Sequence, residues 1–144
     1  MKEFVVFSLI NELYGIDIQK VKGIIVYSQI KITPLFNEKP WILGVTNIRG
    51  EVIPVIDLRK RFSHKSKYTD ETVMIIILTK EGKFMGVVVD YILRIDFIDV
   101  DDIKPINMLQ SIDEKYLDGF VKTKEDEMVS LFNIDLLLDI KEIG

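Results

Sequence analysis

The feature that most constrains the fold of this chain is its content of β-branched residues. Among 144 residues it has 23 Ile and 14 Val, and it has no Ala. β-branched side chains pack well on a pleated sheet, whereas Ala is the strongest helix former. We therefore expect a mostly β fold, and the length is that of one ordinary domain.

Short apolar segments bounded by turn residues recur along the chain. Many short strands of this kind are typical of a β-sandwich or of small barrels. Pro54 lacks the N–H that a sheet ladder needs, so we expect it at an edge or a bulge. Brief helices are expected at Asn37–Leu43, Leu58–Phe62, Asp113–Leu117 and Asn133–Ile140. The expected strands are Phe4–Ile10, Tyr14–Ile18, Lys22–Ser28, Gly44–Asn47, Glu51–Asp57, Val73–Leu78, Phe84–Val89, Leu93–Asp99, Gly119–Lys122 and Glu127–Phe132.

Local matches in the same chain order indicate an internal repeat. Because matches among β-branched residues also arise easily by chance, duplication and coincidence both stay open. Two duplicated barrels packed together would form a groove, and binding partners commonly lodge in grooves. The matched pairs are Gly15 and Gly86 (71 residues apart), Pro34 and Pro105 (71), Gly44 and Gly119 (75), and Asp57 and Asp135 (78).

Missing residue types exclude whole classes of chemistry. The chain has no Cys, and His64 is its single His. Thiol nucleophiles, disulfides, Cys-rich zinc sites and iron–sulfur clusters are therefore impossible, as is a multi-histidine metal site. No catalytic constellation is visible either. We expect no enzyme activity, no cofactor and no metal.

Charge and hydropathy argue against nucleic-acid and membrane partners. The net charge of −4 provides no field that would gather nucleic acid or an anionic membrane. The longest apolar run, Val73–Leu78, has six residues, whereas a membrane-spanning helix needs about 20. The segment Met1–Ile10 lacks the small-residue cleavage site of a signal peptide. We therefore expect a cytoplasmic protein with no direct membrane insertion.

The segment Gly44–Arg59 carries the most specific motif in the chain. It reads G-V-T-N-I-R-G-E-V-I-P-V-I-D-L-R. This run closely resembles the signature of the CheW family, the coupling proteins of bacterial chemotaxis. The resemblance extends from about Phe4 to Ile140, through Tyr14–Ile18, Val21, Pro40, Ile42, Leu43, Gly86–Asp90, Tyr116, Leu117, Gly119 and Ile134–Leu137.

The resemblance implies both a fold and a function. The implied fold is two five-stranded SH3-like barrels with a hydrophobic groove between them, in one domain over residues 1–144. We expect subdomains at 14–70 and 71–144, with the strand at 4–10 exchanged between them. The implied function is a non-enzymatic adaptor that joins the cytoplasmic tips of chemoreceptors to the regulatory domain of the CheA histidine kinase. Such adaptors work at the inner face of the membrane, within receptor arrays where ring assembly is expected.

The resemblance also assigns site residues, with one departure from the family pattern. The family often has Glu two places after the valine-type position, where it can pair with the arginine, but here Val21 is followed by Lys22 and Gly23. Glu51 is a candidate substitute for that missing partner. The implied receptor-binding residues are Val21, Gly44, Asn47, Ile48 and Arg49, and the implied kinase-binding residues are Phe7, Ile18 and Val21.

Each of these residues also has an ordinary structural interpretation. An apolar residue and an Arg at a turn, such as Ile48 and Arg49, can anchor a partner or form a plain solvated hairpin. Gly44 can allow a close backbone approach or a positive φ, or it can end a helix after Leu43. Trp41 can anchor a partner, although buried packing is its usual role. Phe7, Ile18 and Val21 are commonly core residues at β spacing.

A different class of function stays open for the basic loop Arg59–Lys67. Its cations could contact phosphates, which would make the chain a small β-barrel nucleic-acid-binding module, but only Phe62 and Tyr68 lie near to act as stacking aromatics. The acidic residues at 96, 99, 101 and 102 lack the ligand spacing of a calcium loop. We interpret Asp101 and Asp102 as caps of a short turn.

Overall fold

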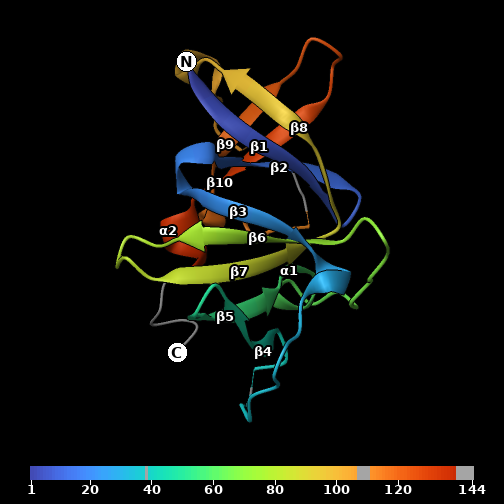
Figure 1. Ribbon diagram of the computed structural model, residues 1–144. Coiled ribbons are helices and arrows are strands. Elements are labelled where there is room, and N and C mark those ends of the chain that lie inside the picture. The colour runs from blue at the N-terminus through green and yellow to red at the C-terminus, as the bar shows by residue number, and fades with distance from the viewer. Residues whose placement is uncertain (38, 107–110, 139–144) are drawn as a thin grey trace.

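Two five-stranded sheets pack against each other to form the molecule (Figure 1). The computed structural model describes residues 1–37, 39–106 and 111–138. Sheet A has the strand order β8-β1-β2-β10-β9, and sheet B has the order β3-β6-β7-β5-β4. Sheet A consists of β1 (Lys2–Leu9), β2 (Glu12–Asp17), β8 (Tyr91–Ile98), β9 (Leu117–Lys122) and β10 (Met128–Phe132). Sheet B consists of β3 (Val21–Val26), β4 (Ile42–Ile48), β5 (Glu51–Asp57), β6 (Val73–Leu78) and β7 (Phe84–Val89).

The expectation of a mostly β fold is confirmed, and each expected strand is present within a few residues of its expected bounds. Three of the expected helices are also present, as α1 (Leu58–Arg61), a 3₁₀ turn (Glu114–Tyr116) and α2 (Ile134–Leu137). The expected end of the last helix at Ile140 lies outside the described residues. Further 3₁₀ turns are Ile18–Lys20, Tyr27–Gln29 and Val100–Asp102.

The helix expected at Asn37–Leu43 is wrong. β4 already begins at Ile42, and the described residues before it form a turn. The carbonyl of Trp41 accepts a hydrogen bond of 2.8 Å from the N–H of Asp57, so pairing with β5 holds this stretch extended. Tertiary pairing therefore overrides a short helical pattern that has little stability of its own.

The two sheets have the same internal arrangement. Each has a central parallel pair, β2 with β10 in sheet A and β7 with β5 in sheet B. The hairpin β9–β10 corresponds to β4–β5, the hairpin β1–β2 corresponds to β6–β7, and β8 corresponds to β3. This correspondence is what an internal duplication produces. Each sheet is open in the described part of the chain, since no pairing joins its two edge strands there, so the expected barrels are not closed.

The sheets do not follow the expected subdomain boundary near residue 70. Sheet B runs continuously from Val21 to Val89, whereas sheet A combines strands from both ends of the chain. The N-terminal segment that joins the second half of the chain in sheet A thus includes all of β2 as well as the expected strand at 4–10. The physical reason is that β6 pairs with β3 and β7 pairs with β5, which binds residues 73–89 to the preceding strands.

Two glycines mark equivalent places in the repeat. Gly44 has φ +144° and Gly119 has φ +152°. A Cβ atom at Gly44 would overlap the carbonyl oxygen of Thr33, and one at Gly119 would overlap that of Lys104. The residue after each glycine pairs with that same neighbouring backbone. Gly44 therefore allows a close backbone approach inside a strand, and it does not end a helix.

The two short helices begin in the same way. The side chain of Asp57 caps α1 by accepting from the N–H of Lys60 (3.3 Å). The side chain of Asn133 caps α2 by accepting from the N–H of Leu136 (3.1 Å). The structural equivalent of Asp57 is therefore Asn133, and the match of Asp57 with Asp135 was wrong by two residues.

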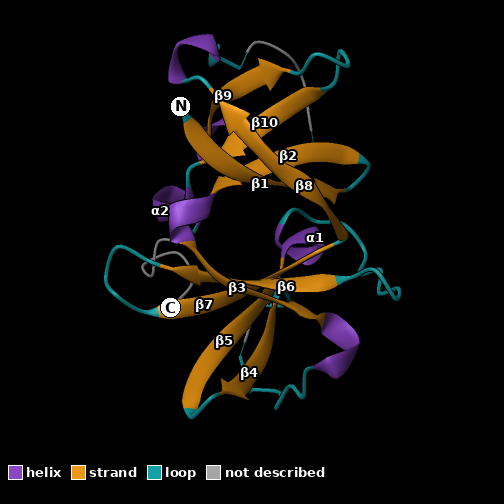
Figure 2. Cartoon of the chain, turned by 45° about the horizontal axis from the view of Figure 1, so that its top comes forward, coloured by secondary structure: helices purple, strands orange, loops and turns teal. Residues whose placement is uncertain are grey.

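The largest apolar cluster lies between the sheets, where α1 and α2 also lie (Figure 2). From sheet A it takes Phe7 and Tyr14, and from sheet B it takes Ile75 and Val87. Two smaller clusters belong to single sheets. The space between the sheets is therefore filled by core side chains, which fix the two sheets relative to each other.

Pro54 lies in an inner strand, yet at a locally unpaired position. The parallel pairing of β5 with β7 starts one residue later, at Val55. On the other side Pro54 faces Val45, whose N–H and carbonyl bond to Thr33 instead. Pro54 is therefore neither at an edge nor at a bulge, and the expectation was wrong. The proline is tolerated because the position of its missing N–H has no ladder partner.

The close contact at Gly44 generates a prediction about stability. Gly44→Ala should lower the free energy of unfolding by at least about 3 kcal/mol, because the new methyl group overlaps rigid backbone. The control Gly82→Ala shares a positive φ (+79°) but meets no atom within 4 Å, and should cost about 1 kcal/mol. Urea unfolding measures both, and equal losses would contradict this account of Gly44.

Candidate functional site

The β4–β5 hairpin projects a two-residue tip from sheet B. Ile48 pairs with Glu51, so Arg49 and Gly50 form the loop, with φ of 52° and 86°. These angles fit the tight turn whose twist matches paired strands. The Asn47 side chain accepts a hydrogen bond of 3.0 Å from the N–H of Gly50 and so holds the turn. The arrangement leaves Arg49 exposed at the tip.

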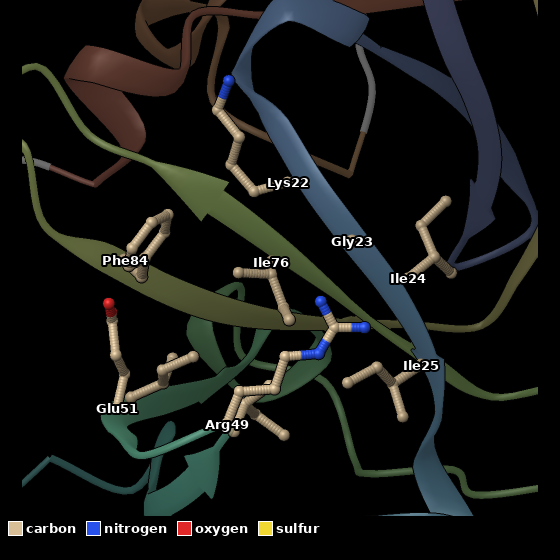
Figure 3. Close-up of a pocket in the computed structure, with 10 residues that line it drawn as sticks. Lys22, Gly23, Ile24, Ile25, Arg49, Glu51, Ile76 and Phe84 are labelled. Atoms are coloured by element: carbon tan, nitrogen blue, oxygen red, sulfur yellow. The ribbon is translucent and has the colours of Figure 1, made fainter.

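A concavity of about 310 Å³ lies between this tip and β3 (Figure 3). We call it the tip pocket. Isoleucines and Phe84 form most of its lining, and Lys22, Arg49 and Glu51 supply its charges. Its full lining is Lys22, Gly23, Ile24, Ile25, Ile48, Arg49, Glu51, Ile53, Ile76 and Phe84. An apolar pocket with a few charged groups at its rim suits an apolar side chain of a protein partner.

Arg49 extends over this pocket without an acidic partner. Figure 3 shows its guanidinium between Ile76 and Ile25, facing the backbone at Gly23. Within the described residues no ion pair or side-chain hydrogen bond involves Arg49. Glu51 does not substitute for the missing carboxylate, since it lies on the Phe84 side of the pocket.

The expected receptor-binding residues divide into surface and interior positions. Asn47 and Arg49 are exposed, and Ile48 is half-buried with its side chain in the tip pocket lining. Gly44 is buried, so its role is to bring two backbones together below the hairpin. Val21 is half-buried at the start of β3 and packs on the inter-sheet core.

The expected kinase-binding residues divide in the same way. Phe7 has no exposed surface, and its ring stacks on Phe132 at 6.0 Å between centroids. A residue in that position cannot touch a partner, which corrects the expected role of Phe7. β1 is buried on both faces, with Phe7 in the inter-sheet core and Phe4 and Val6 in a second apolar cluster. Ile18 and Val21 are half-buried at the two ends of the 3₁₀ turn that carries the chain from sheet A to sheet B.

Both arginines of the basic loop Arg59–Lys67 make contacts within the protein. The Arg59 Nε and Nη2 atoms donate to the two carboxylate oxygens of Asp90 at 2.7 and 2.8 Å. Asp90 also accepts from the N–H of Ile10 at 2.9 Å. The hydrogen bond to Asp90 raises the pKa of the Arg59 guanidinium. This contact spans three separate segments, and no local sequence pattern signals it.

Arg61 is held among aromatic rings. Its guanidinium lies 4.9 Å from the ring centroid of Trp41 and 5.3 Å from that of Tyr116, and it donates to the Tyr116 hydroxyl at 2.8 Å. Trp41 is half-buried against the inter-sheet core, so packing is its role in this structure. These contacts join α1 to the residues that directly precede β4 and β9.

The aromatic neighbours of the basic loop are also occupied. Phe62 packs on the inter-sheet core. Tyr68 stacks on Tyr27 at 4.5 Å and donates to the buried carboxylate of Asp57 at 2.6 Å, which also accepts from Ser66 at 2.7 Å. Partial burial, together with the hydrogen bond to Asp57, raises the pKa of the Tyr68 phenol. The loop therefore presents no free stacking aromatics, and nothing supports the nucleic-acid alternative.

The acidic segment near residue 100 is structural. Asp96 accepts from Arg94 at 2.8 Å, and Asp99 caps the turn Val100–Asp102 by accepting from the N–H of Asp101. The cap is thus Asp99, and the expectation that Asp101 and Asp102 serve as caps was wrong. The described residues contain no cluster of three potential metal ligands. They also contain no helix that is long and apolar enough to span a membrane.

Known proteins resemble this chain over nearly its whole length. The family model of the CheW-like domain matches residues 3–142. A protein named chemotaxis protein CheW from Klebsiella aerogenes is 36% identical over 144 residues, covering 99% of this chain and 85% of that protein. A protein of the same name from Treponema pallidum is 32% identical over 147 residues, covering 98% and 84%. The crystal structure of scaffolding protein TtCheW from Thermoanaerobacter tengcongensis has a TM-score of 0.83 at 34% identity, covering 94% of this chain and 86% of that one.

The burial of Phe7 and the partial exposure of Ile18 generate a paired prediction. Phe7→Ala should lower the free energy of unfolding by about 3–5 kcal/mol, since it leaves a cavity in the inter-sheet core. Ile18→Ala should cost about 1 kcal/mol, because part of that side chain already faces solvent. Chemical denaturation of both variants checks this, and a Phe7 variant as stable as the wild type would place Phe7 outside the core.

Proposed function

Because this chain belongs to the CheW-like domain family, we propose that it is a chemotaxis scaffold that joins chemoreceptors to the CheA histidine kinase through contacts alone. The observation that carries the proposal is the tip pocket with Arg49 at its rim, on a fold similar to the TtCheW scaffold. Such a scaffold acts on the cytoplasmic side of the membrane, where the signalling tips of the receptors lie. Copies joined in rings within an array make individually weak contacts strong together.

The receptor contact is centred on the β4–β5 hairpin tip. Ile48 and Arg49 form the contact, Asn47 holds the turn that presents them, and Gly44 supports the hairpin from within. Val21 begins β3, and the next two residues of that strand, Lys22 and Gly23, line the tip pocket. Arg is a frequent anchor in protein interfaces because its planar guanidinium offers several donors in a fixed geometry.

The kinase contact is centred on the turn between the sheets. Ile18 and Val21 flank the 3₁₀ turn Ile18–Lys20, and Lys20 forms an ion pair with Asp135 of α2 at 3.8 Å. The Asp17 side chain caps the turn by accepting from the N–H of Gln19. Phe7 supports this surface only from the core. Two half-buried apolar side chains on a well-held turn suit a contact with a second domain of this fold in the kinase.

The receptor contact is tested by titrating a soluble signalling-domain fragment of a chemoreceptor from the same organism. Arg49→Ala should weaken binding at least about tenfold, because it removes the anchor at the pocket rim. Lys65→Ala is the matched control, since it removes an exposed cation from the basic loop, and it should leave binding unchanged. Equal affinities for the two variants would contradict the receptor assignment of Arg49.

The kinase contact is tested by calorimetry with the regulatory domain of CheA from the same organism. Ile18→Asp should abolish measurable one-to-one binding, since it places a charge in an apolar contact. Gln19→Asp adds the same charge one residue away on an exposed side chain and should bind nearly as the wild type does. If Ile18→Asp binds normally while folded, the kinase face lies elsewhere.

A further inference from the structure

We propose that the tip pocket recognises an acidic residue beside an apolar one on the receptor, with the carboxylate pairing to Arg49. The inference rests on the proposed function and adds the chemistry of the partner. The glycine at position 23 makes this pairing available, because no side chain there competes for the guanidinium.

Arg49 differs from the other arginines of the chain. Of the four arginines in the sequence, Arg59 and Arg94 hold carboxylates at 2.7–2.8 Å, and Arg61 is held among aromatic rings. Within the described residues Arg49 is the one arginine whose side chain has neither kind of partner. A guanidinium forms its strongest pair with a carboxylate in a two-point contact. This arginine is therefore free to receive one from outside.

The charges around the tip pocket favour an acidic group. Two cations, Lys22 and Arg49, line it, whereas Glu51 is its single acid and lies on the Phe84 side (Figure 3). The rest of the lining is mostly apolar, and Ile25 and Ile76 lie on either side of the guanidinium in Figure 3. A carboxylate brought there by a partner meets an opposite charge near low-dielectric side chains, where ion pairs are screened less than in water. The apolar side chain next to that carboxylate on the receptor would then pack against the isoleucines of the pocket.

Gly23 is not required by the backbone. Its φ lies outside the left-handed region, and a Cβ built on it would have one neighbour, the Ile76 Cδ1 atom, at 3.4 Å. A larger residue therefore fits with ordinary contact. Because the Arg49 guanidinium faces this position, a carboxylate introduced here would pair with it within the chain. The glycine thus keeps both the pocket mouth and the guanidinium open.

The test compares Gly23→Glu with Gly23→Gln in the full chain, titrated with the receptor signalling-domain fragment. Both side chains have the same size, so they fill the pocket mouth alike, but only Glu offers a carboxylate to Arg49. We expect Gly23→Glu to bind roughly two- to fivefold more weakly than Gly23→Gln, the range set by an exposed ion pair. Unfolding midpoints of the two variants establish that both are folded.

A second measurement does not depend on position 23. Wild-type affinity should fall as salt is added, and Arg49→Gln should reduce that salt dependence, because the pair that salt screens is gone. An unchanged salt dependence in Arg49→Gln would overturn the inference.

The outcomes separate this inference from the proposed function. If the wild-type chain fails to bind the receptor fragment, the proposed function fails with it. If the wild type binds but the Glu and Gln variants bind equally, the function stands and the acidic contact is refuted. Tighter binding by Gly23→Glu would also refute it, since the internal carboxylate would then position Arg49 instead of competing for it.

Discussion

The apolar layer between the sheets is the constraint on which the rest of the molecule depends. The ring centroids of Phe7, Tyr14 and Phe132 lie 5.0–6.1 Å apart there. Residues from the strands of sheet B pack against these rings. Neither sheet can bury this layer alone, because its residues come from both. The layer fixes the hairpin tip on sheet B relative to the turn at Ile18, so the two proposed contacts are held on one rigid support.

Strand positions were readable from sequence because β-branched runs and turn residues alternate sharply. The segments Glu51–Asp57 and Phe84–Val89 are strands over the expected residues. What sequence could not provide was the partner of each strand. The hairpin β6–β7 was expected with the second half of the chain, yet it belongs to sheet B together with β3, β4 and β5. Long-range pairing decides this, and local patterns carry no information about it.

In the candidate site, too, some residues could be identified from local sequence and others could not. Asn47, Ile48 and Arg49 were identifiable because their turn chemistry and motif are local. For Phe7 the sequence left a core role and a contact role both open. The structure decides for the core because β1 is buried on both faces, with Phe4 and Val6 in one apolar cluster and Phe7 in the layer between the sheets. The ion pair between Arg59 and Asp90 joins residues that are 31 positions apart in the sequence. The hydrogen bond from Tyr68 to Asp57 forms because the basic loop folds back toward the start of α1. Such contacts are set by the fold and have no local signature.

The composite origin of sheet A has a consequence for synthesis on the ribosome. β1 pairs with β8 along its length, from Lys2 with Ile98 to Ser8 with Tyr91, so β1 must wait for a strand that is made much later. Sheet B, by contrast, is complete once Val89 has emerged. Chains emerge from their N-terminus, and pairings distant in sequence form slowly. The hairpin β1–β2 is therefore made before sheet B and yet is among the last parts of this domain to find its neighbours.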